Sequence, residues 1–384
     1  MTNLKSYASP LSDSRPRYEL LDGLRGIAAF VVIWYHFGEG FATSPVDQMI
    51  NHGYLAVDFF FVLSGFVLGY AYDNRWKNGS MTAGRFMLRR VIRLHPMVIL
   101  SVILGAVAYL IQGSVQWDGT PVPLTTLLLA LFLGLFLIPV IPGIDADVRG
   151  NGEMFPLNGP SWSLFFEYIG SILYALILHR LSKCSLFGVV VLSAVGLAVM
   201  ALGNTSEAYH IGFGWSAAGW GFLGGFFRLS FSFSAGLLIS RCFRKIRIRG
   251  AFWICTLILC TVMACPYVGG AEPNVYNALY DLFCTFFIFP AVVYLGACGN
   301  TTDRFSTSTC NFLGQLSYPI YIIHYPVMYL FYAWVWNNSL AFDQVWPVCV
   351  CLFFGIVFMA WCAMRFYDTP VRNYLTARFV NKKR

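Results

Sequence analysis

Charged residues are scarce in this sequence. Of its 384 residues, only 11% are Asp, Glu, Lys or Arg, whereas 58% are hydrophobic. Soluble domains carry about a quarter charged residues, so this composition excludes an ordinary soluble enzyme. Apolar runs near twenty residues long recur along the chain, and such runs are typical of bilayer-spanning helices. The sequence therefore predicts an all-α integral membrane protein that works in contact with the lipid bilayer.

Cysteine patterns that bind metal are also missing. All eleven cysteines lie from Cys184 onward, and no two form a Cys-x-x-Cys pair or a cysteine-histidine cluster of zinc spacing. We interpret them as small core hydrophobes rather than disulfides or metal ligands, and expect no metal. The net charge of +8 does not indicate a nucleic-acid partner, because the basic residues cluster in short loops where they set membrane orientation.

No apolar core is present in the first twenty residues, which argues against a cleaved signal peptide. We expect a cytoplasmic N-terminal segment over 1–20, one transmembrane domain over 21–368 and a cytoplasmic tail over 369–384. No internal repeat and no Pro/Gly-rich linker divides the chain.

The number of spans follows from the basic loops. Positive-inside orientation places the loops at 73–93, at Lys183 and at 241–249 in the cytoplasm, together with the tail. An odd number of crossings must then lie between 94 and 141, where two runs are visible. We expect the short, proline-flanked run at 124–141 to be re-entrant or interfacial, with a full crossing as the alternative. About ten spans remain, in a bundle with both termini cytoplasmic. The eleven apolar runs are 22–41, 54–72, 94–112, 124–141, 161–180, 186–203, 220–240, 251–268, 277–296, 314–334 and 345–366.

Ionisable residues interrupt the first two runs. Arg25 and His36 are eleven residues apart, which is close to three turns and about 16 Å along a helix, so they share one face. Asp58 and a polar Ser64-Gly65 break lie in the second run. Ionisable groups inside membrane helices are costly and usually face a bundle interior or a cavity, so these residues indicate a functional site. The alternative is a structural network within the bundle.

Two arginines stand three residues apart where the third run begins. Arg90 and Arg93 share a helix face at the mouth of that span. The planar guanidinium binds oxyanions through two hydrogen bonds, so convergent arginines suit a phosphate-bearing ligand. Ordinary attraction of a basic loop to lipid headgroups is the alternative.

Polar residues also interrupt two later runs. Glu167 follows Trp162 and Ser163, and we expect it to pair with an arginine or to accept a proton, because an isolated buried carboxylate would be driven to protonate. Trp162 taken alone is equally consistent with an aromatic of the membrane interface. His324 lies within a late span between two prolines, where it is either a site residue or a hydrogen-bonded packing histidine.

These segments together resemble the membrane-bound acyltransferase 3 family over nearly the whole chain. The resemblance implies a ten-span bundle in the bacterial inner membrane and an acyl-CoA donor approaching from the cytoplasm. It also implies transfer of the acyl group to a hydroxyl, commonly on a carbohydrate or a glycosylated small molecule. Acyl-CoA is a co-substrate, and no permanently bound cofactor is expected. We expect a stand-alone member without the fused extracytoplasmic esterase-like domain that many bacterial members carry. The matching segments are LDGLRGIAAFVVIWYHF, VDFFFVLSGF, RVIR at 90–93, PSWSLFFE and LSYPIYIIHYP.

The resemblance implies His36 as the catalytic base, Arg25 as its functional partner, and donor binding by Arg90 and Arg93. A neutral imidazole can take the proton of an alcohol that attacks a thioester, and a covalent acyl-histidine is the alternative route. A proton-coupled secondary transporter is the alternative function for buried Arg, Asp and His residues, although transporters often show two related halves. The predicted catalytic residues are His36, Arg25, Asp58 and Glu167, and the predicted substrate-binding residues are Arg90, Arg93, Ser64, Gly65, Phe66, Trp162, Ser163 and His324.

Overall fold

The computed structural model describes residues 18–244, 246, 248–299 and 304–381. These residues form α-helices joined by short 3-10 and π segments, which confirms the predicted all-α class. Most of the expected N-terminal segment, Lys245 and Arg247 of the basic loop, and the last three residues of the tail lie outside the described residues. The helices are α1 (Glu19–Glu39), α2 (Ala56–Lys77), α3 (Ala83–Gln112), α4 (Leu124–Leu135), α5 (Ser161–Leu176), α6 (Lys183–Leu202), α7 (Gly221–Cys242), α8 (Ala251–Met263), α9 (Val275–Phe283), α10 (Phe289–Cys298), α11 (Arg304–Asn337), α12 (Phe342–Ala363) and α13 (Thr369–Phe379).

Within the described ranges, seven helical stretches are long and apolar enough to cross a bilayer. The protein is therefore an integral membrane protein, as predicted. The expected number of ten is larger by three, because α5 and α8 have only 16 and 13 residues, and the 34-residue α11 is not among the seven. The seven stretches are Glu19–Glu39, Asn51–Lys77, Ala83–Gln112, Lys183–Leu202, Gly221–Cys242, Val275–Cys298 and Phe342–Phe379.

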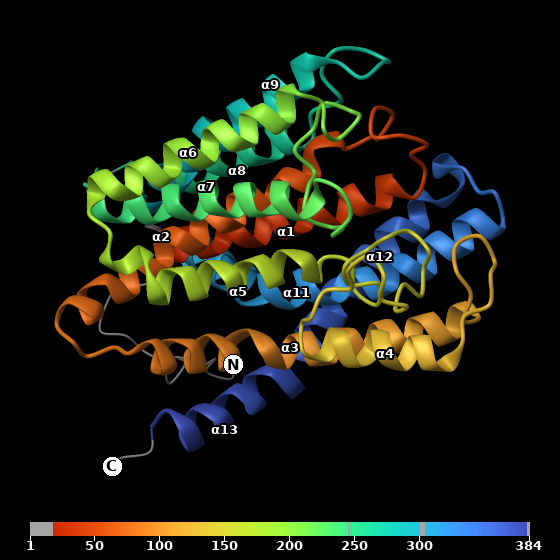
Figure 1. Ribbon diagram of the computed structural model, residues 1–384, viewed down its shortest axis with the longest axis horizontal. Coiled ribbons are helices and arrows are strands. Elements are labelled where there is room, and N and C mark those ends of the chain that lie inside the picture. The colour runs from red at the N-terminus through yellow and green to blue at the C-terminus, as the bar shows by residue number, and fades with distance from the viewer. Residues whose placement is uncertain (1–17, 245, 247, 300–303, 382–384) are drawn as a thin grey trace.

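The long helices run along the long axis of the molecule, and their connections gather at its two ends (Figure 1). We call one of these the cavity end, where the connections 40–50, 113–123 and 203–220 come together on the right of the view. The connection 78–82 and the end of α7 lie at the opposite end.

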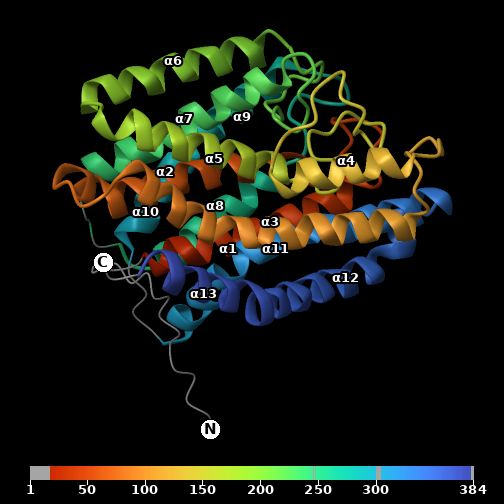
Figure 2. The same ribbon diagram turned by 60° about the horizontal axis from the view of Figure 1, so that its bottom comes forward.

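Helices α4 and α5 each occupy only half of the bundle's length. Figures 1 and 2 show α4 in the half that contains the cavity end and α5 in the other half. With 12 residues, α4 is about 18 Å long, which is less than the roughly 30 Å of a hydrocarbon core. Helix α4 ends beside the middle of α3, where Nε2 of His95 is 2.9 Å from the Leu135 carbonyl oxygen. The chain then returns to the cavity end, because the Trp117 amide donates to the Arg149 carbonyl at 3.1 Å.

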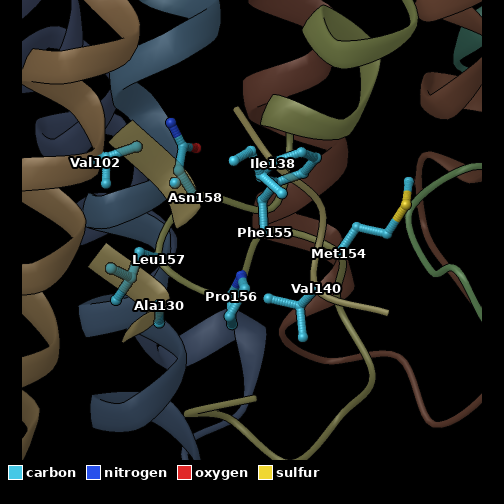
Figure 3. Close-up of a pocket in the computed structure, with 10 residues that line it drawn as sticks. Val102, Ala130, Ile138, Val140, Met154, Phe155, Pro156, Leu157 and Asn158 are labelled. Carbon is cyan, nitrogen blue, oxygen red and sulfur yellow. The ribbon is translucent and has the colours of Figure 1, made fainter. Parts of the chain in front are cut away.

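The returning segment 136–160 packs against α3 and α4. Val140, Met154 and Phe155 of this segment line a small void together with Val102 of α3 and Ala130 of α4, and Figure 3 labels these residues. The void has a volume of about 10 Å³ and a mostly apolar lining, so it holds at most a single water molecule. It is a packing defect and not a ligand site.

Glycines let the helices that carry the candidate site approach closely. A Cβ atom added to Gly26 of α1 would lie 2.6 Å from the Leu313 Cβ of α11. A Cβ atom added to Gly65 of α2 would lie 2.0 Å from the Phe233 carbonyl oxygen of α7. Small residues at such contacts let the backbones of membrane helices meet. The pairs α1 with α11 and α2 with α7 are thereby fixed in position.

Candidate active site

His36 lies in the last turn of α1, at the cavity end. Its Nδ1 atom is 2.7 Å from Oε2 of Glu39, one turn further along the helix. A carboxylate can only accept, so Nδ1 carries the proton and donates it, which leaves Nε2 with a free lone pair. The Tyr332 hydroxyl lies 2.9 Å from the same Glu39 oxygen and holds that carboxylate in place. The result is an oriented imidazole.

A large cavity opens beside His36. Its volume is about 880 Å³, within the range of pockets that bind drug-sized ligands. Both His36 and Glu39 line it, and much of the remaining wall comes from the connections at the cavity end. Aromatic side chains dominate that wall: Tyr35, Tyr54, Trp117, Trp162, Phe213, Trp215, Trp220, Tyr267, Tyr321, Tyr325, Tyr329, Tyr332 and Trp336.

One face of α11 supplies a column of these aromatic residues. They recur every three or four positions, so they lie one above the other on the helix. The Tyr325 ring is 4.7 Å from the His36 ring, centroid to centroid. Helix α11 therefore forms a continuous aromatic wall beside the imidazole. The column consists of Tyr321, Tyr325, Tyr329, Tyr332 and Trp336.

The structure brings His324 next to His36. The two rings are 5.3 Å apart, although the residues are almost 300 positions apart in sequence. His324 is fully buried, its Nδ1 lies 3.1 Å from the Ile320 carbonyl, and its Nε2 has no hydrogen-bond partner within the described part of the chain. A second imidazole with an uncommitted nitrogen thus stands behind the first.

Asp58 forms a buried ion pair with Arg228 of α7. The carboxylate accepts two bonds from the guanidinium, at 2.6 and 3.1 Å, and both side chains are fully buried. Arg228 also donates to the Phe213 carbonyl at 2.7 Å and lies 5.2 Å from the Trp162 ring centre. Arg228 and Trp162 line the cavity, whereas Asp58 does not, so Asp58 acts on the cavity through Arg228.

Glu167 has an arginine partner, which is one of the two alternatives that the sequence left open. It pairs with Arg90 of α3 and accepts a bond from the Ser64 hydroxyl at 3.2 Å. Arg90 also donates to the Ser171 hydroxyl at 3.1 Å and is almost fully buried. This network ties α2, α3 and α5 together, and its members do not line the cavity.

Arg25 binds the backbone of α11 toward the opposite end of the molecule. Its Nε donates to the Ser317 hydroxyl at 2.7 Å, and its Nη2 donates to the Gly314 carbonyl at 2.9 Å. Asp22 lies 3.4 Å from the same guanidinium. Arg25 and His36 thus mark two ends of one helix.

Arg93 is the exposed member of an arginine cluster. Arg25, Arg90 and Arg372 all lie close enough to repel its positive charge. No hydrogen bond or ion pair to Arg93 is found among the described residues, while Arg372 pairs with Asp368 at 3.0 Å. A guanidinium among like charges, with no ion-pair partner in the described structure, is a suitable anchor for an anion.

Three predicted substrate-binding residues lie outside the cavity wall and contact neighbouring residues. Gly65 meets the backbone of α7, and the Phe66 ring is fully buried 5.2 Å from the Tyr18 ring. The Ser163 hydroxyl bonds the Tyr321 hydroxyl at 2.7 Å. None of the three lines the cavity, although Ser163 positions a tyrosine that does.

Comparison with known sequences decides the family. A family model described as an acyltransferase domain matches residues 18–365, which include every candidate site residue except Arg372 and its partner Asp368. The chain belongs to the acyltransferase 3 family. The predicted assignment is confirmed, the protein is a membrane-bound acyltransferase, and the transporter alternative is set aside.

Relatives of this acyltransferase come from bacteria. It is 37% identical over 201 residues to protein 2 in the picA locus of Rhizobium radiobacter, covering 50% of this chain and 98% of that protein. It is 35% identical over 91 residues to the peptidoglycan O-acetyltransferase OatA of Listeria monocytogenes, covering 23% of this chain and 13% of that protein. Acyltransferase MdmB of Streptomyces mycarofaciens is 30% identical over 164 residues, 40% of this chain and 37% of that protein. No solved structure matches the acyltransferase.

The sequence analysis missed several residues of the candidate site of this acyltransferase. Glu39 stands one turn after His36, so its spacing alone could have indicated a partner. Arg228 interrupts an apolar run, the same signal that identified Asp58. Glu153 had no local signal, because it lies in the segment 136–160 and reaches the cavity only through the fold. Its carboxylate accepts bonds from Tyr329 and from the Asn151 amide, the latter at 3.1 Å, and burial raises its pKa to about 7.

Proposed function

We propose that this acyltransferase moves an acetyl or another short acyl group from acyl-CoA to a hydroxyl of a carbohydrate or glycosylated small molecule, with His36 as general base. One observation carries the proposal. The His36 ring, held by Glu39 at 2.7 Å, borders a cavity of about 880 Å³ that can hold a sugar-sized acceptor.

The reaction needs one general base that takes the proton of the acceptor hydroxyl and later gives it to the leaving thiolate. Nε2 of His36 takes the proton of the acceptor hydroxyl while the oxygen attacks the thioester carbonyl carbon. The C–S bond then breaks, and the imidazolium gives that proton to the leaving thiolate. Glu39 stabilises the imidazolium between the two steps, and general base catalysis of this kind contributes about 10²–10⁴-fold in rate.

The arginine cluster supports a donor site at the opposite end. Arg93 has no hydrogen bond or ion pair within the described structure, so its fork is free for the phosphates of the donor nucleotide. Arg25 and His36 are about 16 Å apart along α1. An extended pantetheine arm can bridge that separation, which brings the thioester to His36 while the phosphates stay among the arginines.

The aromatic wall supports a sugar-like acceptor. Tyr and Trp rings offer flat apolar faces with a polar edge, and such rings stack against the C–H faces of sugar rings while their polar atoms bond hydroxyls. Trp162 is one such ring. The name of the Listeria relative, a peptidoglycan O-acetyltransferase, agrees with a carbohydrate acceptor.

The remaining predicted residues act as positioning groups in this proposal. Asp58 holds Arg228 against the cavity wall, and Ser163 holds Tyr321. Glu167 holds Arg90 in its place within the arginine cluster. His324 packs behind His36 and limits the positions that its ring can adopt.

The membrane arrangement is part of the proposal. We infer ten crossings in the bacterial inner membrane, with both termini in the cytoplasm and α4 as a re-entrant helix. The length of α4 and the return of segment 136–160 to the cavity end support this topology. The cavity then faces away from the cytoplasm, so donor and acceptor approach His36 from opposite sides.

Replacing His36 tests the proposal. Purified His36→Ala protein, incubated with acetyl-CoA and glycoside acceptors, should release CoA thiol at least about 10²-fold more slowly than the wild type. His179→Ala is the matched control, because His179 stacks on Trp76 at 4.1 Å and does not line the cavity. Wild-type turnover by His36→Ala protein that elutes as a folded species would refute His36 as the base.

A further inference from the structure

Two carboxylates in the cavity have no part in the reaction proposed above. Glu153 is 6% exposed and lines the wall formed by segment 136–160. Glu207 lies in the connection 203–220, is exposed, and has no hydrogen bond from its side chain among the described residues. Neither is needed to orient His36, which already has Glu39.

Positive charge is scarce in the same cavity. Among the described lining residues there is no lysine, and Arg228 is the one arginine. Arg228 is neutralised by the buried pair with Asp58. His210 also lines the wall, but burial lowers its pKa to about 4, so it is uncharged at neutral pH. The lining residues therefore carry an excess of negative charge, and Arg149 behind the wall offsets part of it.

The aromatic walls already hold cations of the protein itself. Arg149, buried behind the wall, has its guanidinium carbon 3.3 Å from the ring centre of Tyr329 and 4.9 Å from that of Trp117. On another side Arg228 faces Trp162 at 5.2 Å. Aromatic faces attract cations through the ring quadrupole, and the attraction grows where water is excluded. Rings such as Trp220 and Trp336 remain without a stacked cation in the described structure.

We infer that the acceptor carries a protonated amine as well as the hydroxyl that is acylated, and that Glu153 and Glu207 recognise this amine together with the aromatic wall. The inference rests on the proposed function and names the acceptor class within it, an amino sugar or a glycoside of similar chemistry. An ammonium group pairs with a carboxylate and stacks on rings, whereas a phosphate or carboxylate would be repelled by the same wall. The cavity therefore binds sugars that carry an amine and excludes acidic sugars.

Binding of the amine depends on pH through Glu153. The groups that face its carboxyl are Tyr329 on α11, Arg149 and Asn151 on its own segment, and Glu39 on α1. Burial outweighs the positive charge of Arg149, so the pKa is about 7 and the carboxyl is largely protonated at pH 6. Affinity for an amine should therefore rise between pH 6 and pH 8, while the primary amine of the probe stays charged.

Three glycosides that differ at one carbon test the inference. They are methyl 6-amino-6-deoxyglucoside, methyl glucoside and methyl glucuronide, which carry an amine, a hydroxyl and a carboxylate at carbon 6. Quenching of tryptophan fluorescence in the purified full chain measures their affinity without any acyl donor. At pH 7.5 the amine should bind about tenfold more tightly than the neutral sugar, and the acid most weakly.

Matched variants assign the preference to the two carboxylates. Glu153→Gln together with Glu207→Gln should reduce the amine preference to less than about threefold, and Glu153→Gln alone should flatten the rise between pH 6 and pH 8. Asp118→Asn is the control, because Asp118 is an exposed carboxylate of the connection 113–123 that does not line the cavity. Equal binding of all three sugars, no binding of the amine, or a preference that survives the double substitution would overturn the inference.

Turnover with acetyl-CoA separates this inference from the proposed function. Tight binding of the amine without His36-dependent thiol release supports the amine site and refutes the acyl transfer proposed above. Efficient acylation of the neutral sugar, with the amine excluded, supports the transfer and refutes the amine site.

Discussion

At the level of single residues, the reactivity of His36 depends on which nitrogen its ring presents to the cavity. Glu39 accepts from Nδ1 at 2.7 Å, so the basic lone pair is on Nε2. Without an acceptor at Nδ1 the proton could occupy either nitrogen, and the ring could rotate. Tyr332 restrains Glu39 in turn, so the orientation of the base is determined by contacts of α1 with α11.

Glu39→Gln should therefore lower kcat by about 10²-fold with a smaller change in KM, because the amide still accepts from Nδ1 but no longer stabilises the imidazolium. Steady-state kinetics over a pH series measures both constants. Asp343→Asn is the control, since Asp343 is exposed on α12 and does not line the cavity. If kcat is unchanged, His36 acts without its carboxylate partner.

The two predicted donor arginines should behave differently from each other. Arg93→Lys keeps the charge but loses the two-pronged geometry, so it should weaken acyl-CoA binding about tenfold and leave the binding of an acyl-pantetheine that lacks the nucleotide unchanged. Arg90 is tied to Glu167 and Ser171, so Arg90→Lys should also lower the thermal midpoint of the protein. Binding isotherms of each variant for acyl-CoA and for the acyl-pantetheine measure the two affinities. Equal loss of both ligands in Arg93→Lys would mean that the phosphates bind elsewhere.

Residue-level prediction from the sequence used one local rule. Arg25, His36 and Asp58 were selected because ionisable residues are unusual in apolar runs, and the same rule applied consistently would have selected Arg228. The partners of these residues were not predictable. Glu167 could be expected to need an arginine, but the choice of Arg90 depends on how α3 and α5 pack, which no local pattern encodes.

At the level of elements, the geometry of the site depends on how closely α1 approaches α11. Gly26 allows that contact, and the column from Tyr321 to Trp336 faces the His36 side of α1 because of it. The sequence carries the aromatic period of this column, with a Tyr or Trp at every third or fourth position from Tyr321 to Trp336, but the sequence analysis did not use it. The helix that this face packs against could not be predicted, because a periodic face shows which side of a helix is buried but not which neighbouring helix covers it.

Gly26→Ala should destabilise the protein by about 1–3 kcal/mol, because the new methyl group would overlap Leu313 of α11. The thermal midpoint in detergent measures the effect. Gly84→Ala is the matched control, since its added Cβ would meet no atom within 4 Å at the start of α3. Equal midpoints for the two variants would show that α1 and α11 separate easily to admit the methyl group.

At the level of the whole molecule, the half-length helices α4 and α5 decide the topology. The sequence predicted a re-entrant segment near 124–141 from the parity of basic loops, and the structure gives a 12-residue α4 followed by a return to the cavity end. The sequence could not show that α5 is also short, because the apolar run at 161–180 continues past its end at Leu176. A helix of 16 residues is about 24 Å long, which is less than the roughly 30 Å of a hydrocarbon core. Helix α5 can therefore reach one face of the membrane only if its start at Ser161 lies within the bilayer, below the opposite face.

Cysteine labelling tests this topology in intact cells. In a background where the exposed cysteines Cys184, Cys242 and Cys351 are serine, Asp145→Cys in segment 136–160 should react with a membrane-impermeant maleimide added outside. Asn78→Cys, in the connection between α2 and α3, should react only after permeabilisation, because the arginines near it orient that end toward the cytoplasm. Both positions are exposed, so a difference in labelling reports the side of the membrane and not accessibility. Labelling of Asp145→Cys only after permeabilisation would mean that 124–141 crosses the bilayer fully and that the acceptor cavity opens on the same side as the donor.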